Sequence, residues 1–425
     1  MTHKYNIAME IKRDLLLRQL MDLRHNGMIK VITGMRRSGK SYLLFKLFID
    51  ALKAEGVNEE HIIKVNLEDR RNKSLRDPDK LLEYIDSNLK DDKMHYVLLD
   101  EVQLVNEFED VLNSYLQVSN ADVYVTGSNA RFLSKDVITE FRGRGIELRV
   151  HPLSFREVHG ARPEEPIDQL WIEYMTYGGL PQVLTMSSDQ KKVEYLKGLF
   201  KQTYLRDIKE RYDIKLDSDL EELISTLASS IGGLTNPRKL ADTFRTVKKS
   251  NISQETIKTY LDYLQDAFII ERALRYDIKG KHYIDTPSKF YFEDLGLRNA
   301  LLNFRQVEKT HLMENAIYNE LRIRGFSVDV GEVVWNTRDE DGKKIRKNLE
   351  VDFVCNQGYK RSYIQSAFSI PDDQKREQEL QSLRRIGDSF QKIVIVGDHS
   401  PRYQNDEGIL FMDIYDFLLD ENSVD

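Results

Sequence analysis

Hydrophobic positions follow two different periods in the first 155 residues, and each period predicts its own kind of element. Leucines at positions 15, 16, 20 and 23 recur at helical spacing, which predicts an amphipathic helix over residues 13–23. Short apolar runs predict strands at residues 29–33, 62–67, 96–99 and 123–125, and alternating apolar and polar residues predict a fifth strand at 146–150. Helical patterns separate the second, third and fourth runs. Strands that alternate with helices in this way build a mostly parallel sheet covered on both faces.

The pattern changes after this region, and it divides the rest of the chain into three parts. Residues 156–232 show helical spacing without strand signals. Two short helical patterns and a hairpin that turns at Lys279-Gly280-Lys281 then give the layout of a winged helix. In the last hundred residues helices are predicted at 312–324 and 373–385, and strands at 327–335, 349–355, 363–368 and 393–396. We therefore predict an α/β fold of four domains, at residues 1–155, 156–232, 233–305 and 306–425.

Composition and charge narrow the class of protein. The chain has 425 residues, of which 40% are hydrophobic and 31% charged, as in folded globular domains. Its single cysteine, Cys355, fits a reducing compartment. No signal peptide and no apolar stretch of about 20 residues is found, so we expect a cytoplasmic protein without a membrane partner. The net charge of −7 argues against an overall basic surface for nucleic acid but allows a local basic face.

One motif directly after the first predicted strand points to phosphate chemistry. Residues 34–41 match G-x-x-x-x-G-K-[ST] in full. Glycines let backbone amides surround a phosphate, Lys40 reaches the β- and γ-phosphates, and Ser41 offers a hydroxyl to Mg²⁺. The residues expected to bind nucleotide are Gly34, Met35, Arg36, Arg37, Ser38, Gly39, Lys40, Ser41 and Tyr42.

The third strand ends in the acidic pair Asp100-Glu101, about sixty residues after this motif. Asp100 is expected in the Mg²⁺ shell with Ser41, and Glu101 is placed to orient the attacking water. No Asn-Lys-x-Asp guanine signature is present. The pair therefore predicts ATP and Mg²⁺ as cofactors.

Two polar segments further along could complete the catalytic site. Ser128 or Asn129, after the fourth strand, could reach the γ-phosphate or the water, although a simple turn would explain them equally well. Arg142 or Arg144 could neutralise transition-state charge in a neighbouring subunit. Either arginine could instead be a solvated loop residue.

The order of these motifs resembles one group of prokaryotic ATP-binding proteins, which are AAA+ ATPases related to the archaeal-type and STAND clades. Further matching segments are Pro152-Leu-Ser-Phe-Arg-Glu157, Tyr177-Gly-Gly-Leu-Pro181, Tyr204-Leu-Arg-Asp-Ile208, Tyr291-Phe-Glu-Asp-Leu-Gly296 and Glu350-Val-Asp-Phe353. The resemblance covers nearly the whole chain. It implies an AAA+ P-loop core, a helical lid, a winged helix and a C-terminal fold similar to PD-(D/E)XK nucleases.

The C-terminal segment departs from an active nuclease pattern. Glu314, Asp352 and Gln365 follow the order of its metal-binding positions, but Gln365 replaces a carboxylate and Ala367 replaces a lysine. An amide is a poor metal ligand and alanine cannot assist a water molecule. We expect a degenerate domain kept for binding, unless these acids are simply surface or helix-cap residues.

The expected partners follow from the last two domains. Lys258 on the second winged-helix helix, with Lys279, Lys281 and His282 in the hairpin, could contact DNA phosphates, including branched or single-stranded DNA. A homo-oligomeric ring would supply the arginine in trans. The alternatives are a nucleotide-dependent signalling switch that binds a protein partner and, less favoured, an active ATP-coupled nuclease. None of the nine histidines has a partner at metal-ligand spacing, so no zinc site is expected.

Overall fold

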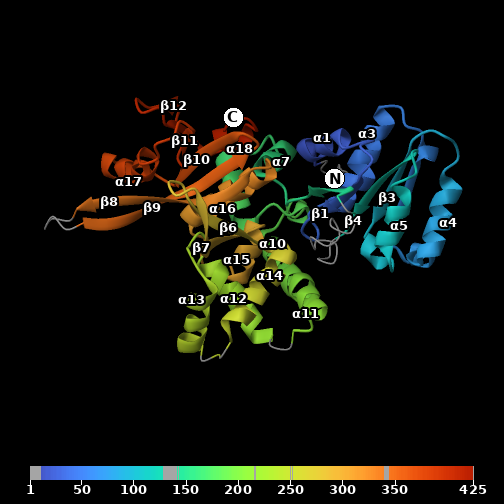
Figure 1. Ribbon diagram of the computed structural model, residues 1–425, viewed down its shortest axis with the longest axis horizontal. Coiled ribbons are helices and arrows are strands. Elements are labelled where there is room, and N and C mark those ends of the chain that lie inside the picture. The colour runs from blue at the N-terminus through green and yellow to red at the C-terminus, as the bar shows by residue number, and fades with distance from the viewer. Residues whose placement is uncertain are drawn as a thin grey trace, which may run out of the picture. The chain divides into compact units, whose positions relative to one another are not determined.

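The computed structural model describes residues 11–127, 141, 143–214, 217–248, 250, 252–338 and 344–424. Contacts divide the chain into two compact units. Unit 1 contains residues 1–153, 180–185 and 266–268, and unit 2 contains residues 154–179, 186–265 and 269–425. Each unit has its own sheet (Figure 1).

Unit 1 is built on a parallel sheet with the strand order β2-β3-β4-β1-β5. The strands are β1 (Ile29–Thr33), β2 (Ile62–Asn66), β3 (His95–Asp100), β4 (Ala121–Thr126) and β5 (Gly145–Arg149). The helices are α1 (Asp14–Asp22), α2 (Lys40–Tyr42), η1 (Leu43–Phe48), α3 (Ile49–Ala54), η2 (Glu59–His61), η3 (Arg70–Arg76), α4 (Pro78–Asn88), η4 (Val102–Leu104), α5 (Phe108–Tyr115) and α9 (Pro181–Leu184). The predicted parallel sheet is confirmed.

Successive residues of these strands enter two separate cores. Val31 and Leu99 pack with α4 and α5, whereas Ile32 and Leu98 pack with α1 and the continuous helix formed by α2, η1 and α3. Because both faces of β1, β3 and β4 are buried, these three strands are continuous apolar runs, whereas β2 and the edge strand β5 carry exposed polar residues between apolar ones. This burial is why the sequence predicts their positions closely.

Unit 2 combines many helices with a mixed sheet of order β12-β13-β11-β10-β9-β8-β6-β7. Its strands are β6 (Ile270–Asp277), β7 (His282–Phe292), β8 (Ser327–Arg338), β9 (Lys344–Gln357), β10 (Lys360–Ala367), β11 (Gln391–Val396), β12 (Tyr403–Gln404) and β13 (Leu410–Asp413). Its helices are α7 (Phe155–Ala161), α8 (Ile167–Tyr177), α10 (Asp189–Leu199), η6 (Phe200–Leu205), α11 (Arg206–Tyr212), α12 (Asp217–Ser229), α13 (Pro237–Thr243), η7 (Phe244–Lys248), α14 (Gln254–Asp266), α15 (Leu295–Leu301), α16 (Lys309–Ile323), α17 (Asp373–Arg384) and α18 (Ile414–Leu419). The described part of residues 156–232 is helical without strands, as the periodicity predicts.

The hairpin expected as a wing is present, but its first strand has a second partner. β6 pairs antiparallel with β7 and, on its other side, parallel with β8. The hairpin therefore forms one edge of the unit 2 sheet, together with strands from the last hundred residues. Sequence periodicity identifies strands, but it does not report which strand pairs with which across a long connection.

Two motifs that carried the family resemblance contact each other in unit 2. The buried carboxylate of Asp294 caps α15 by accepting the Leu297 N–H at 2.9 Å and accepts the Gly179 N–H at 2.8 Å. Gly296 allows close backbone approach, because a Cβ there would lie 2.0 Å from the Tyr177 oxygen. These segments, 115 residues apart, therefore have a structural role here.

The C-terminal segment extends further than the sequence patterns predict. The strand at 393–396 was expected to complete it, but β12, β13 and α18 follow. β13 has only four residues, too few for a clear period, and it pairs parallel with β11. Among the helices that the described ranges contain, none combines the length and apolarity needed to cross a bilayer.

Candidate functional site

Three neighbouring strands of unit 1 deliver polar residues to the same edge of the sheet. β4 lies between β1 and β3, and all three run parallel. The P-loop motif at 34–41 follows β1, Asp100 ends β3, and Thr126 ends β4. Because the carboxyl ends of parallel strands share one edge, the topology brings these groups together.

The backbone of the P-loop requires its glycines. Gly34 has φ +131°, and a Cβ there would lie 2.1 Å from the Val150 oxygen. Gly39 has φ +100° and precedes α2. Arg37 also adopts a positive φ, of 66°, which is uncommon outside glycine and typical of strained functional loops.

Lys40 is held inside this loop by neutral groups. Its buried Nζ donates to the backbone oxygens of Gly34 at 2.9 Å and Met35 at 3.0 Å. Burial lowers the pKa of Lys40 to about 8, although the charges of Glu101 and Asp100 oppose the shift. The ammonium is therefore positioned without a bound carboxylate.

Asp100 accepts hydrogen bonds from both neighbouring segments. Its Oδ1 accepts the Ser41 hydroxyl at 3.0 Å and the Thr126 hydroxyl. Burial raises the pKa of Asp100, and the two hydroxyl hydrogen bonds act against that rise. The expected proximity of Ser41 and Asp100 is therefore present in the structure, whereas Thr126 was missed, because a threonine at a strand end carries no distinctive signal.

Glu101 stands at a strained backbone position next to this pair. It adopts φ 58° and ψ 48°, and its N–H donates to Thr126 Oγ1 at 3.1 Å. Its carboxylate also accepts a hydrogen bond from the Gln103 amide. A left-handed conformation at a glutamate costs about 1–3 kcal/mol and persists where surrounding contacts fix it.

Sequence reasoning also missed an arginine that supports the loop. Arg13, just before α1, is buried and donates to the Ser38 oxygen and to the His151 oxygen, each at 2.9 Å. These bonds join the P-loop to the segment after β5. Ser38 Oγ is buried and has no hydrogen-bond partner within the part of the chain that is described, so a polar group remains available in the loop.

Of the remaining candidates of unit 1, only Arg144 lies among the described residues. Ser128, Asn129 and Arg142 fall outside the described residues. Arg144 is exposed and directly precedes β5, whose first residue pairs with Ile29 at the start of β1. Arg144 therefore lies at the opposite edge of the sheet from the P-loop of its own chain.

The predicted acidic positions of unit 2 surround a lysine. Lys289 on β7 is buried, and its Nζ lies 2.9 Å from Glu314 Oε1, 2.7 Å from Glu350 Oε1 and 3.9 Å from Asp352 Oδ1. The Tyr291 hydroxyl donates to Glu314 Oε1 at 2.7 Å. Glu314 and Asp352 are themselves buried, so they are not surface acids. We call Lys289, Glu314, Glu350 and Asp352 the lysine–carboxylate cluster.

Burial and the charges of the neighbouring groups together shift the pKa values in this cluster. Burial raises the pKa of Asp352 to about 8, and the neighbouring Glu314 adds to the shift. Burial by itself would lower the pKa of Lys289, but the charges of Glu314, Asp352 and Glu350 raise it overall. The ammonium is thus the cation that these carboxylates stabilise.

Gln365 is not brought to this cluster. Strand alternation places it on the face of β10 that holds Tyr363 and Ala367, which pack in one core with Leu380 and Leu383 of α17. Its amide oxygen lies 3.5 Å from the Ser382 hydroxyl. Asp352 instead accepts the Ser366 N–H at 2.8 Å.

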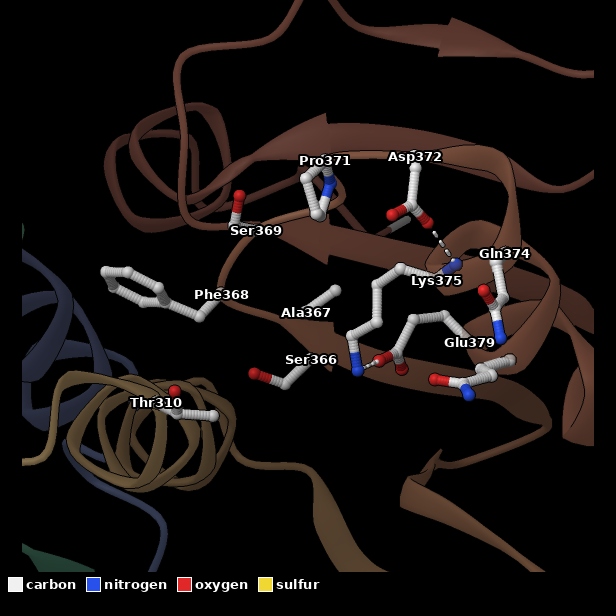
Figure 2. A pocket seen from close by; sticks show the side chains of 11 residues that line it. Thr310, Ser366, Ala367, Phe368, Ser369, Pro371, Asp372, Gln374, Lys375 and Glu379 are labelled. Atoms are coloured by element: carbon white, nitrogen blue, oxygen red, sulfur yellow. Dashed lines mark hydrogen bonds and ion pairs between the residues drawn. The ribbon is translucent and has the colours of Figure 1, made fainter.

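A cavity of about 480 Å³ opens beside this end of β10 (Figure 2). Ser366 and Ala367 line it, with Thr310 from α16 and residues of α17. The lysine in its wall, Lys375, is paired with Glu379 at 2.5 Å. The lining therefore offers no substitute for the nuclease lysine that Ala367 replaces.

Two family models match separate parts of the chain. A family described as "AAA domain" matches residues 26–159, and a domain of unknown function (DUF8612) matches residues 168–308. An uncharacterized protein of Haemophilus influenzae is 34% identical over 414 residues, covering 96% of this chain and 98% of that protein. An uncharacterized protein of Methanocaldococcus jannaschii is 28% identical over 370 residues, covering 84% of this chain and 78% of its own length.

A solved structure shows the same fold. The Walker-type ATPase paby2304 of Pyrococcus abyssi aligns with a TM-score of 0.50 and 15% identity, covering 69% of this chain and 96% of that one. Together with the parallel sheet and the P-loop geometry, these matches identify the fold of the first domain. The chain belongs to the same family as the H. influenzae protein, and its residues 26–159 match the family described as an AAA domain.

Proposed function

We propose that this protein binds ATP with Mg²⁺ and hydrolyses the ATP at the shared strand edge of unit 1. The observation that carries the proposal is the position of Lys40 beside the Ser41–Asp100 pair. Lys40 is buried, and within the described residues its hydrogen bonds go to backbone oxygens. Phosphate oxygens are stronger acceptors for an ammonium than neutral carbonyls are. Bound nucleotide would therefore replace the internal hydrogen bonds of Lys40 with charged ones.

The residues at this edge fit the chemistry of both cofactors. The backbone amides of the P-loop and the helix that begins at Lys40 favour an anion. Ser41 and Asp100 offer the hydroxyl and carboxylate oxygens that Mg²⁺ prefers. When bound, Mg²⁺ would neutralise charge on the β- and γ-phosphates.

Glu101 is the residue that we propose to orient the attacking water. Its backbone is fixed by Thr126, and its side chain is half-buried at the end of β3. A carboxylate placed beside the phosphate site can accept the proton of the water molecule. Gln103, which bonds this carboxylate, would restrict its rotation.

The pKa of Lys40 predicts how nucleotide affinity depends on pH. Only the protonated amine binds phosphate strongly, so affinity is full below pH 8 and is lost as the pH rises through that value. If bound phosphate keeps the amine protonated, the Kd for ATP rises about eightfold between pH 7.5 and pH 9. Calorimetric titration at the two pH values measures the change.

Lys40→Ala is the control for this titration. It should bind ATP much more weakly, and its remaining affinity should lack the step, because the titrating amine is gone. Equal wild-type affinity at pH 7.5 and pH 9 would contradict the assigned role of Lys40.

We also propose that a neighbouring copy of the chain completes the catalytic site. Arg144 is exposed at the sheet edge opposite its own P-loop, at the far ends of β1 and β5. It can therefore meet a phosphate site only in another subunit. Head-to-tail contacts of this kind close into rings.

Mixing two inactive variants tests this arrangement. Lys40→Ala lacks the lysine that would bind the phosphates but keeps Arg144. Arg144→Ala keeps Lys40 but lacks the arginine. Each alone should hydrolyse ATP at least about a hundredfold more slowly than wild type, since arginines in this role contribute 10³–10⁵. Random equimolar assembly should restore about one quarter of wild-type turnover, because half the sites keep the lysine and half of those meet an intact arginine. A mixture no more active than its two components would rule out Arg144 acting in trans.

DNA is the partner that we propose for unit 2. Lys258 on α14 and Lys279, Lys281 and His282 in the β6–β7 turn are all exposed. Solvated lysines on a helix and a hairpin turn can contact phosphates, which makes binding salt-dependent. The ATP-bound state would then be coupled to DNA binding.

Binding to duplex and branched DNA measured from 50 to 200 mM salt tests this partner. The double variant Lys279→Ala/Lys281→Ala should weaken binding to all sequences and reduce the slope of log K against log salt by about 2. Lys46→Ala/Lys53→Ala, which removes two exposed lysines of unit 1, is the control. If no DNA form shows salt-sensitive binding, DNA is not the partner. That result would favour the alternative of a nucleotide-dependent signalling switch that binds a protein.

For the lysine–carboxylate cluster we propose a binding role without nuclease activity. Lys289 occupies the centre of the carboxylates that a divalent metal would need. An ammonium satisfies their charge but cannot act as a Lewis acid. The nuclease-like domain would then contribute to DNA binding only.

Removing the lysine should expose a metal site. In Lys289→Ala, Glu314, Glu350 and Asp352 lose their cation. A divalent ion should bind there and displace the proton that the raised pKa keeps on Asp352. We expect 1 mM Mn²⁺ to raise the Tm of Lys289→Ala by several degrees more than that of wild type, measured by thermal unfolding. Lys289→Gln is a second variant should the alanine form fail to fold.

Lys192→Ala is the matched control for this measurement. Lys192 is also buried, but it has one close carboxylate, that of Glu173 at 2.6 Å, and its second, that of Asp189 at 3.9 Å, is exposed to solvent. Its loss creates no metal site, so Mn²⁺ should have no added effect. Equal Mn²⁺ stabilisation of wild type and Lys289→Ala would show that the lysine does not replace a metal.

A further inference from the structure

Two histidines and an aspartate meet at the edge of the unit 1 sheet opposite the P-loop. His61 ends η2 just before β2, His95 begins β3, and Asp91 lies in the segment that leads into β3. One ligand atom from each residue lies within 4.8 Å of the other two. Because His61 is 34 residues from His95, sequence spacing did not reveal the group, and no zinc site was expected.

Asp91 faces both imidazole rings. Its Oδ2 lies 3.2 Å from His61 Nε2, and its Oδ1 lies 4.0 Å from His95 Nε2. The two rings meet edge to face, with centroids 4.9 Å apart. The carboxylate and the two Nε2 atoms therefore point into one small volume.

The hydrogen bonds of His95 prepare its Nε2 to act as a ligand. Nδ1 lies 2.7 Å from the Lys93 oxygen, and since a carbonyl can only accept, we assign the proton to Nδ1. This leaves a lone pair on Nε2, which accepts the Lys90 N–H at 3.2 Å. A backbone carbonyl that fixes the Nδ1 proton is the usual support of a metal-binding histidine.

Burial and access also suit a metal. His61 and His95 are buried, whereas the side chain of Asp91 is 42% exposed. The histidines are thus held by the fold, and the exposed carboxylate provides a route for entry. Zinc–nitrogen bonds of about 2.0–2.1 Å place tetrahedral ligand atoms about 3.3 Å apart. The ligand atoms of the three residues lie within 4.8 Å of one another, so the two that are farthest apart must approach by about 1.5 Å. The exposed Asp91 can supply part of this movement.

We propose that His61, Asp91 and His95 bind one Zn²⁺. Two imidazoles and one carboxylate are ligands that suit zinc and leave a fourth position for water. Zinc binding would displace the proton that His61 Nε2 shares with Asp91. It would also break the hydrogen bond that the Lys90 N–H donates to His95 Nε2. It would tie the starts of β2 and β3 to the connecting segment, roughly 17 Å along β3 from Asp100, so the site is separate from the ATP chemistry.

Zinc titration of the full, nucleotide-free chain against a fluorescent chelator tests the proposal. Wild type should bind one Zn²⁺ per chain at this site. Asp91→Asn should weaken that affinity at least tenfold, since the carboxylate supplies one of three ligands and even the loss of a supporting partner costs about 10–100-fold. Asp92→Asn, at the adjacent exposed carboxylate, is the matched control and should bind as wild type does.

Thermal unfolding gives a second readout. Zn²⁺ should raise the Tm of wild type and of Asp92→Asn but not that of Asp91→Asn or His61→Gln. Asp91 is exposed, so its variant should fold even if His61→Gln does not. No zinc binding by wild type, or equal affinity in wild type and Asp91→Asn, would overturn the assignment.

Discussion

The candidate site of unit 1 depends on one hydrogen bond, which the Ser41 hydroxyl donates to Asp100 and which joins the helix after β1 to the end of β3. This bond forms because β4 separates the two strands by one position and all three run parallel. Thr126 at the end of β4 donates to the same carboxylate, so one buried anion connects all three strand ends. Hydrogen bonds to a charged group contribute about 1.5–3 kcal/mol each, and a buried carboxylate without them would be costly.

The two lysine sites of the molecule differ in what satisfies their charge. Lys40 donates to the backbone oxygens of Gly34 and Met35, which are neutral, so its ammonium still gains from a negatively charged ligand. Lys289 is already balanced by Glu314, Glu350 and Asp352. In unit 1, Lys40 therefore leaves the site ready to receive an anion. In unit 2, Lys289 already occupies the position between the carboxylates that a metal ion would need. This contrast explains why we assign catalysis to unit 1 and only binding to the C-terminal segment.

Much of unit 1 could be predicted because its information is local. The central strands β1, β3 and β4 are continuous apolar runs. The P-loop is eight consecutive residues, and its glycines have conformational roles at Gly34 and Gly39. The parallel strand rule then placed Asp100 beside Ser41. Residues whose position depends on contacts with distant parts of the chain were harder to predict from the sequence. Arg13 reaches Ser38 and His151, 25 and 138 residues away, and no pattern near Arg13 indicates either contact.

The same limit applies to unit 2. The sequence placed Glu314 and Asp352 as a possible pair, and the structure brings them together, but around a lysine 25 residues before Glu314. Gln365 was grouped with them by order along the chain, although strand alternation turns it toward α17. The edge position of the β6–β7 hairpin depends on β8, more than fifty residues after β6 begins. Long-range pairing is set by packing of the whole sheet, which local periodicity does not contain.

The measurement that tests the central claim most directly compares ATP binding and steady-state phosphate release in wild type and Glu101→Gln with Mg²⁺. Glutamine keeps the shape of the side chain but cannot accept a proton from water. The account predicts that Glu101→Gln binds ATP as tightly as wild type and retains it unhydrolysed. Equal phosphate release by the two proteins would contradict it, because the proposed site would then not be where ATP is hydrolysed.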